Sequence, residues 1–211
     1  MKALVVVDIQ NDFLPGGALA VSQGDTIIPV VNELMNAFDL VVATQDWHPA
    51  DHESFASNHH GKKIGDIIDL HGLDQVLWPD HCIQHTNGAA FAGALNTSLI
   101  KRTFRKGTDS RVDSYSGFFD NGKKHDTGLC SYLKDYQVNE VFIVGLATDY
   151  CVKFTALDAA SLGFKTTVIL DAVRAVNLQP TDQELAIQTM NQAGIKTINS
   201  HEIADGSESS S

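Results

Sequence analysis

The chain alternates short apolar runs with segments whose apolar residues recur at helical spacing. The runs at 4–7 and 141–144 are continuous stretches of Val, Ile, Leu and Phe, as in strands buried on both faces. Segment 26–38 instead places Ile27, Val31 and Leu34 on one helical face. Applied along the chain, these patterns predict strands at 4–7, 40–44, 99–104, 141–144, 166–170 and 196–198, and helices at 26–38, 88–96, 129–136, 149–162 and 181–193.

Strands that alternate with helices indicate a mainly parallel sheet covered by helices on both faces, which is a three-layer α/β/α sandwich. We expect a single domain over residues 1–204. Residues 45–92 form a long insertion rich in His, Asp, Pro and Gly, and its two tryptophans and Phe55 favour an ordered site over a tail. Residues 205–211 are predicted to be a solvated C-terminal tail.

Cys151 lies where an apolar run meets a helical pattern. The run 141–144 leads into Gly145, and the helix predicted at 149–162 begins close to the cysteine. A thiol in a first helical turn lies beside unpaired backbone N–H groups and the positive end of the helix dipole, where it ionises more readily. By itself such a cysteine is more often a small buried apolar residue, so its partners decide the interpretation.

Those partners come from the carboxyl ends of other predicted strands. Parallel strands end at the same edge of a sheet, and functional groups of α/β proteins gather there. The strand ends carry Asp8, Asp46, Lys106, Cys151 and Asp171. Asp8, Lys106 and Cys151 together form an acid, an ammonium and a thiol, a coherent set for nucleophilic catalysis.

A metal-binding pattern lies beside this set. Asp46 and His48 are two residues apart on extended chain, so their side chains leave the same face, and Pro49 favours that geometry. His81 is a candidate third ligand from a second loop. Two histidines and one carboxylate with an open position suit one divalent ion, Zn²⁺ first and Fe²⁺ or Mn²⁺ as alternatives.

Composition and charge exclude several classes of function. The 211 residues carry a formal net charge of −11, which disfavours sequence-independent binding to nucleic acid. The apolar runs are too short to span a membrane, and the N-terminus lacks a signal-peptide pattern, so we expect a cytoplasmic protein. The three cysteines are widely spaced, which makes a disulfide framework improbable and leaves the roles of Cys82 and Cys130 open.

Seven motifs together resemble the bacterial nicotinamidases among the isochorismatase-like cysteine hydrolases. The likeness runs in register from about residue 3 to about residue 193. The motifs are the segments 8–13 (DIQNDF), 16–21 (GGALAV), 45–49 (QDWHP), 78–82 (WPDHC), 104–107 (FRKG), 112–118 (VDSYSGF) and 145–152 (GLATDYCV).

The resemblance implies a function and assigns roles to residues. It implies hydrolysis of nicotinamide to nicotinate and ammonia in NAD salvage, with pyrazinamide as a further substrate. The implied catalytic residues are Asp8, Lys106 and Cys151, with an oxyanion hole at Ala147 and Cys151 after a cis peptide at Leu146–Ala147. The implied metal ligands are Asp46, His48 and His81, with His52, Glu53 or Ser54 left open as a fourth. The implied contacts to the pyridine ring are Phe13, Leu19, Trp78, Tyr115 and Tyr150.

Two other functions compete with this interpretation. The protein could hydrolyse another small amide, such as an N-carbamoyl or ureido compound, whose enzymes usually lack the Asp46/His48 and Trp78/His81 patterns. It could also be a non-catalytic binding protein on the same fold, and an ammonia assay would decide. A homo-oligomer is possible, and the sequence does not settle it.

Overall fold

A computed structural model describes residues 1–205 of the chain, so residues 206–211 of the predicted tail lie outside it. Asp205 is the last residue of a short helix, α5 (His201–Asp205). The extent of the domain, 1–204, stays a prediction. None of the helices in the described part has the length and apolar character to cross a membrane.

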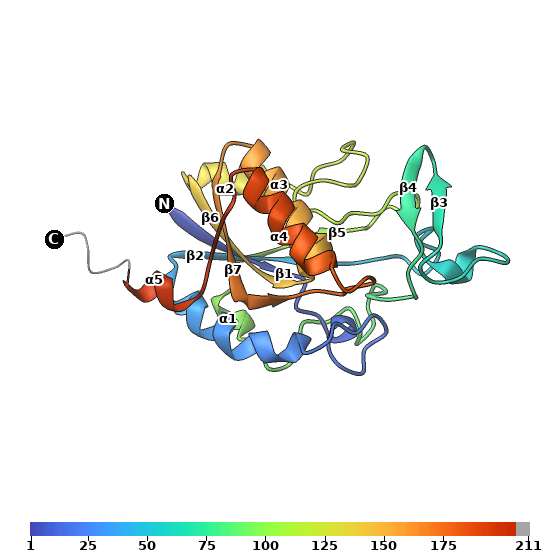
Figure 1. Ribbon diagram of the computed structural model, residues 1–211, viewed down its shortest axis with the longest axis horizontal. Coiled ribbons are helices and arrows are strands. Elements are labelled where there is room, and N and C mark those ends of the chain that lie inside the picture. The colour runs from blue at the N-terminus through green and yellow to red at the C-terminus, as the bar shows by residue number, and fades with distance from the viewer. Residues whose placement is uncertain (206–211) are drawn as a thin grey trace.

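The centre of the fold is a six-stranded sheet in the order β5-β2-β1-β6-β7-β8, and every neighbouring pair in it is parallel. Helices cover both faces of this sheet (Figure 1). The predicted α/β/α sandwich is therefore confirmed. The strands are β1 (Lys2–Val7), β2 (Leu40–Asp46), β5 (Arg102–Lys106), β6 (Glu140–Leu146), β7 (Lys165–Arg174) and β8 (Lys196–Ile198).

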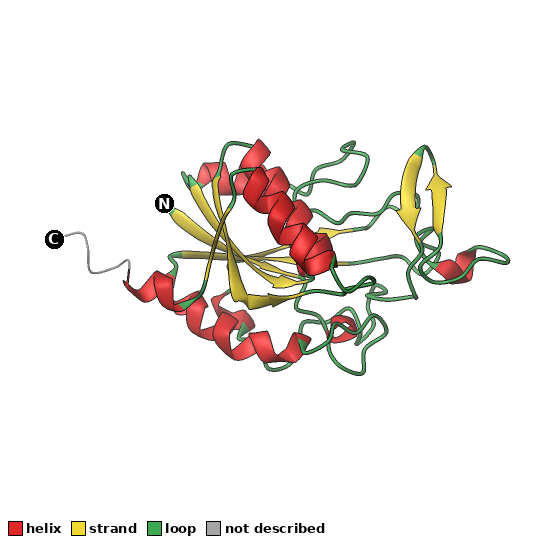
Figure 2. Ribbon diagram, in the orientation of Figure 1, coloured by secondary structure: helices red, strands yellow, loops and turns green. Residues whose placement is uncertain are grey.

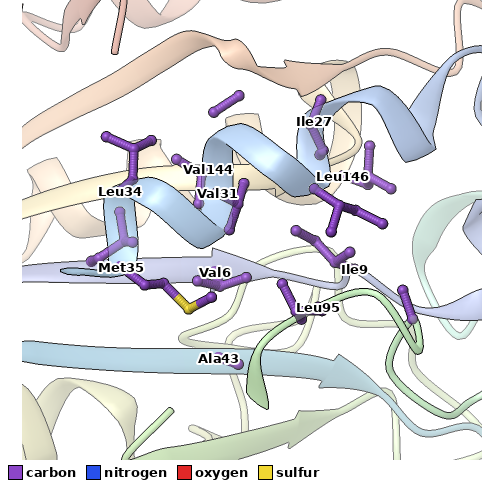
Figure 3. Packing of buried hydrophobic residues seen from close by; sticks show 14 of the residues in the cluster. Val6, Ile9, Ile27, Val31, Leu34, Met35, Ala43, Leu95, Val144 and Leu146 are labelled. Atoms are coloured by element: carbon purple, nitrogen blue, oxygen red, sulfur yellow. The ribbon is translucent and has the colours of Figure 1, made fainter. Parts of the chain in front are cut away.

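Two apolar clusters hold the layers together, one on each face of the sheet. Successive residues of β1 alternate between them: Leu4 and Val6 belong to the first cluster, and Val5 and Val7 to the second. The first cluster packs beneath α1 (Ile28–Leu34), which contributes Val31 and Leu34 (Figure 3). The second lies under α2 (Leu129–Asp135), α3 (Lys153–Ser161) and α4 (Asp182–Gln192).

The predicted helix at 26–38 is divided. A 3₁₀ turn at Gly24–Ile27 precedes α1, and a second 3₁₀ turn at Met35–Ala37 follows it. Pro29 lies in the first turn of α1, where its missing N–H costs little. The apolar spacing therefore located the buried face and did not resolve the change of helix type.

The helix predicted at 88–96 is wrong. This alanine-rich segment is an irregular loop whose carbonyl groups serve other parts of the chain: Ala89 O accepts from the side chains of Gln10 and Gln45, and Ala90 O accepts from Asn11 N. These tertiary hydrogen bonds replace the helical ones, so local helix propensity is overridden.

The insertion 45–92 is mostly irregular, drawn largely as loops in Figure 2, and it contains a hairpin that the sequence patterns missed. The hairpin pairs β3 (Ile67–Leu70) with β4 (Leu73–Val76) in antiparallel register. In Figure 1 it lies at the end of the molecule opposite α5. Its strands have four residues each, too few for a clear alternation of polar and apolar positions.

Candidate active site

Asp8, Lys106 and Cys151 meet at the carboxyl edge of the sheet. Asp8 follows β1, Lys106 ends β5, and Cys151 lies in a π-helical turn, Thr148–Val152, that follows β6. Lys106 Nζ lies 2.9 Å from Asp8 Oδ2 and 3.4 Å from Cys151 Sγ. All three side chains are buried. The arrangement places one ammonium between a carboxylate and a thiol.

Three further groups fix the ends of this arrangement. Lys106 Nζ donates to the carbonyl of Ser114 at 2.8 Å and also forms an ion pair with Asp46. Thr44 Oγ1 donates to Asp8 Oδ1 at 2.7 Å. Asp8 Oδ1 accepts from Thr44 and Asp8 Oδ2 forms an ion pair with Lys106, so the carboxylate is held in one orientation.

Burial and the shared ammonium set the charges of the site. Burial raises the pKa of Asp8, although Lys106 partly offsets it, so this carboxylate is a better proton acceptor than an exposed one. Burial disfavours the Lys106 ammonium, but the charges of Asp46 and Asp8 outweigh that effect and hold the pKa of Lys106 well above its usual value. Lys106 is therefore a permanent cation.

The sequence prediction of a readily ionised thiol is wrong for the resting protein. Burial raises the pKa of Cys151 well above its usual value, and the Lys106 charge lowers it only in part. The predicted helix start also differs, because a π-helical turn precedes α3 and no side-chain hydrogen bond caps either element. Asp149 instead accepts from Val176 N and Asn177 N. The thiol thus keeps its proton until a nearby base removes it.

The turn before Cys151 brings its backbone to the site. The Leu146–Ala147 peptide is cis, and Ala147 and Cys151 both line the cavity described below. Gly145 has a φ of 117°, and a Cβ at this position would collide with the backbone of Val7. Only glycine allows β6 to approach β1 so closely at its end.

Asp46, His48 and His81 form a compact set of metal-ligand atoms. Asp46 Oδ2 lies 3.5 Å from His48 Nε2 and 3.7 Å from His81 Nε2. One ligand atom from each of the three residues lies within 4.8 Å of the others. The backbone brings the two loops together, since His48 N donates to Cys82 O at 3.0 Å.

The chemistry of this set fits a divalent ion. His48 Nδ1 lies 2.9 Å from Gly107 O and His81 Nδ1 lies 2.8 Å from Pro79 O, contacts that place each proton on Nδ1 and leave Nε2 with its lone pair. His48 Nε2 is buried without a hydrogen-bond partner. A buried orphan nitrogen beside a carboxylate is costly unless a cation occupies the space between them.

The three candidates for a fourth ligand lie in different positions. Glu53 turns outward, where its Oε2 lies 2.8 Å from His71 Nε2. Ser54 Oγ lies 2.7 Å from His52 Nδ1, and Ser54 N donates to the same nitrogen at 3.1 Å. His52 Nδ1 is therefore an acceptor, and the neutral ring carries its proton on Nε2, which is buried without a partner. One ligand atom of His52 lies within 4.8 Å of ligand atoms of His48 and Asp113.

A cavity is lined by Cys151 and by two of the metal-ligand residues, Asp46 and His81. The five side chains predicted to contact a ring also line it, together with Asp113 and Val176, which the sequence did not single out. Trp78 and Tyr150 pack edge to face with ring centroids 4.8 Å apart, and Trp78 Nε1 donates to Tyr115 Oη at 3.2 Å. The cavity residues are Phe13, Leu19, Asp46, Trp78, His81, Asp113, Tyr115, Ala147, Tyr150, Cys151 and Val176.

Two supporting residues were missed in the sequence. Gln10 clamps the backbone of Asp46: its Oε1 accepts from Asp46 N and its Nε2 donates to Asp46 O, both at 2.8 Å. Asp12 Oδ2 accepts from Cys82 N at 2.7 Å and so fixes the residue after His81. Both lie in the segment 8–13, but nothing in spacing alone distinguishes a backbone clamp from a surface polar residue.

The expectation for Asp171 changes, and the open question about Cys82 receives an answer. Asp171 lies within β7, where a register shift lengthens the strand, and its carboxylate accepts from Ser200 N and Ser200 Oγ instead of joining the site. Cys82 is buried in the first apolar cluster, and burial together with the charge of Asp46 raises its pKa well above its usual value. Cys82 is thus a packed, protonated thiol, and Cys130 is half-buried in α2.

Comparison with known proteins agrees with this geometry. The family model described as the isochorismatase domain matches residues 2–202. The chain is 49% identical over 197 residues to the nicotinamidase of Escherichia coli (strain K12), which covers 92% of each protein.

Solved structures give the same result. The nicotinamidase and pyrazinamidase of Acinetobacter baumanii superposes with a TM-score of 0.93 at 50% identity, covering 96% of this chain and 97% of that one. The pyrazinamidase of Pyrococcus horikoshii in complex with zinc has a TM-score of 0.76 at 40% identity, covering 94% and 98%. The family resemblance read from the sequence is confirmed, and the protein belongs to the isochorismatase family.

Proposed function

We propose that this protein is a nicotinamidase, an amidohydrolase that converts nicotinamide to nicotinate and ammonia and so supplies NAD salvage. The observation that carries the proposal is the position of Cys151. Its thiol shares the Lys106 ammonium with Asp8 on one side of a small aromatic cavity, and two residues of the metal-ligand set, Asp46 and His81, line the same cavity. The relatives named nicotinamidase and pyrazinamidase support both nicotinamide and pyrazinamide as substrates.

The first half of the reaction forms a thioester. Asp8 takes the proton of Cys151, and the thiolate attacks the carboxamide carbon. The N–H groups of Ala147 and Cys151 stabilise the oxyanion, and one such donor lowers the barrier by about 3 kcal/mol. Asp8 then gives its proton to the leaving nitrogen, and ammonia departs. The raised pKa of Asp8 suits this exchange, because the same group must accept and return a proton.

The second half releases the acid. Asp8 takes a proton from a water molecule, the water oxygen attacks the thioester carbon, and the Cys151 sulfur leaves. Lys106 stabilises the departing thiolate through its 3.4 Å contact. The cycle ends with nicotinate and with the thiol reprotonated.

Asp46, His48 and His81 would hold one divalent ion, for which we propose Zn²⁺, with Fe²⁺ and Mn²⁺ as alternatives that the same ligands accept. When bound, such an ion is a Lewis acid that can take a pyridine nitrogen and lower the pKa of a bound water. The chain's own aromatic residues hold the ring: Trp78 and Tyr150 form one wall, and Phe13 and Leu19 complete the cavity.

The test is a direct assay on purified protein. Incubation with nicotinamide should yield equal amounts of nicotinate and ammonia, and elemental analysis should find about one ion per chain. Cys151→Ala should abolish ammonia release and retain the ion, whereas Cys130→Ala, a control in α2, should retain activity. Full activity of the Cys151→Ala protein would contradict the scheme.

The same assay separates the alternatives. Turnover of an N-carbamoyl or ureido compound with no turnover of nicotinamide would identify another small-amide hydrolase. Binding of nicotinamide without ammonia release would identify a non-catalytic protein. The metal-ligand set favours a pyridine amide, because those other hydrolases usually lack it.

A further inference from the structure

Asp149 is a buried carboxylate that the proposed reaction does not use. It lies in the π-helical turn Thr148–Val152, the turn that also carries Cys151, and it is only 3% exposed. A carboxylate at this depth must be compensated by hydrogen bonds or by a cation. The groups that bond to Asp149 therefore indicate what it does.

Both oxygens of Asp149 bond to the backbone of one distant segment. Oδ1 accepts from Val176 N at 2.9 Å and Oδ2 accepts from Asn177 N at 2.8 Å, across 27 and 28 residues of sequence. Asn177 has a φ of 53°, a left-handed conformation that turns successive N–H groups toward one anion. Hydrogen bonds to a carboxylate are roughly twice as strong as those between neutral groups. Asp149 thus fastens the chain at 176–177.

The fastened segment connects two elements and is irregular. Residues 175–181 join β7 to α4 and contain no helix or strand, and residues 177–180 are exposed. At the far end of the segment, Asn177 Oδ1 accepts from Gln183 N of α4 at 3.0 Å. At the near end, the Asp149 carboxylate holds the backbone of Val176. The position of Val176 therefore depends on a side chain of another element.

Val176 belongs to the wall of the substrate cavity. It is half-buried, as are Leu19 and Tyr150, so it lies on the exposed side of that wall. The turn that supplies the nucleophile, Cys151, thus also fixes a side chain of the opposing loop. Through Asp149, the space between the nucleophile and Val176 is set by two hydrogen bonds.

We propose that Asp149 is a positioning residue that sets how closely Val176 approaches the substrate ring, and so which ring-substituted nicotinamides the cavity admits. The inference rests on the proposed function, because it concerns the selection of substrates at the same site. It gives a reason for a buried acid two residues before the nucleophile whose partners are all backbone groups of the loop after β7.

The experiment is steady-state kinetics on nicotinamide and on the four nicotinamides that carry one methyl group on a ring carbon. Asp149→Asn leaves one acceptor oxygen and places an amide NH₂ group against the second N–H. The KM for nicotinamide should rise about tenfold or more, the usual effect of losing a hydrogen bond to a charged group, and kcat should change less. Partial unfolding would instead lower the amount of active enzyme, and hence kcat, and leave KM unchanged.

The methylated substrates test whether Asp149 acts through Val176. Val176→Ala enlarges the cavity and keeps both bonds to Asp149. It should raise the KM for nicotinamide and should raise kcat/KM for at least one methylated isomer relative to nicotinamide, because one methyl group in an apolar pocket is worth about tenfold or more. Asp149→Asn should favour the same isomer, since it releases the same side chain.

Two further variants separate position from charge. Asp149→Glu keeps the charge and displaces the oxygens by one methylene, so it should also raise KM and favour that isomer; it carries the test by itself where Asp149→Asn does not fold. Asp158→Asn is the matched control, because Asp158 is a buried carboxylate of α3 that bonds to Lys123. It should keep the wild-type KM and the wild-type order of isomers.

A double substitution completes the test. If Asp149 acts through Val176, the KM of Asp149→Asn with Val176→Ala should be close to that of one single variant; independent effects would multiply. Multiplied effects, a different favoured isomer, or wild-type behaviour of Asp149→Glu would each overturn the proposal. If the wild-type protein releases no ammonia from nicotinamide, the proposed function itself fails. If it does and the variants match the wild type, only this inference fails.

Discussion

Lys106 Nζ lies 3.4 Å from Cys151 Sγ, although the two residues are 45 positions apart in the chain. Lys106 ends β5 and Cys151 follows β6, and β2 and β1 lie between these two strands in the sheet. The lysine reaches the thiol because it ends an edge strand and its side chain runs across the carboxyl edge of the sheet. The same ammonium contacts Asp8 and Asp46. One cation therefore links the nucleophile, the base and a metal ligand.

Removal of the Lys106 charge should destabilise the fold as well as stop the reaction. Lys106→Met leaves Asp8 and Asp46 buried without their cation, and losing one partner of a buried ion pair typically costs about 3–5 kcal/mol. Urea unfolding monitored by circular dichroism measures the loss. Lys101→Met, at an exposed lysine just before β5, is the control and should unfold as the wild type does. An unchanged midpoint for Lys106→Met would show that the two carboxylates do not depend on this ammonium.

A methyl group at Gly107 should damage the metal site. Gly107 has a φ of 64°, and a Cβ there would collide with the imidazole of His48. We expect Gly107→Ala to lower Zn²⁺ affinity at least tenfold and to lower nicotinamide turnover with it. Gly93→Ala is the matched control, because a Cβ at that position meets nothing within 4 Å. Equal affinity of the two variants would mean that His48 can move without losing the ion.

The aromatic wall should govern substrate binding. Trp78 packs against Tyr150 and donates to Tyr115. Trp78→Ala therefore removes one aromatic side chain of the cavity together with the hydrogen bond that holds Tyr115. The KM for nicotinamide should rise about tenfold or more, in line with the loss of an aromatic contact and its buried area. Steady-state kinetics give the value. The KM of Trp78→Phe, which keeps a ring, should lie between those of the wild type and Trp78→Ala. A wild-type KM for Trp78→Ala would place the substrate elsewhere.

Stability at alkaline pH should depend on Tyr150. Burial, and then the charges of Asp149 and Asp182, raise the pKa of Tyr150 to about 12, above its usual value near 10. Between these two values the unfolded chain releases the phenol proton and the folded protein retains it, so stability falls as pH rises. Tyr150→Phe should lose less stability than wild type between pH 8 and pH 11, as measured by urea unfolding. Parallel losses in the two proteins would show that Tyr150 ionises freely in the fold.

The sheet, its helical cover and the edge at which the catalytic groups gather follow from the amino-acid sequence alone. Buried parallel strands such as β1 and β6 contain continuous apolar runs. Asp8, just after β1, and Gly145, near the end of β6, lie at the carboxyl edge because parallel strands all end there. The five ring contacts came from the resemblance to the nicotinamidases, and all five line the cavity. Local pattern and connectivity are sufficient for the sheet and its edge, not for these contacts.

Other features of the site depend on contacts between distant segments, which exist only in the folded protein. The loop at 88–96 is not a helix because its carbonyls accept from Gln10, Gln45 and Asn11. Cys151 holds its proton because burial outweighs the nearby ammonium, and burial is not visible in a motif. Asp149 and Val176 come together only when the segment after β7 packs against the turn before α3. Spacing along a chain fixes which face a side chain leaves, but desolvation and hydrogen-bond partners depend on what the fold places against it.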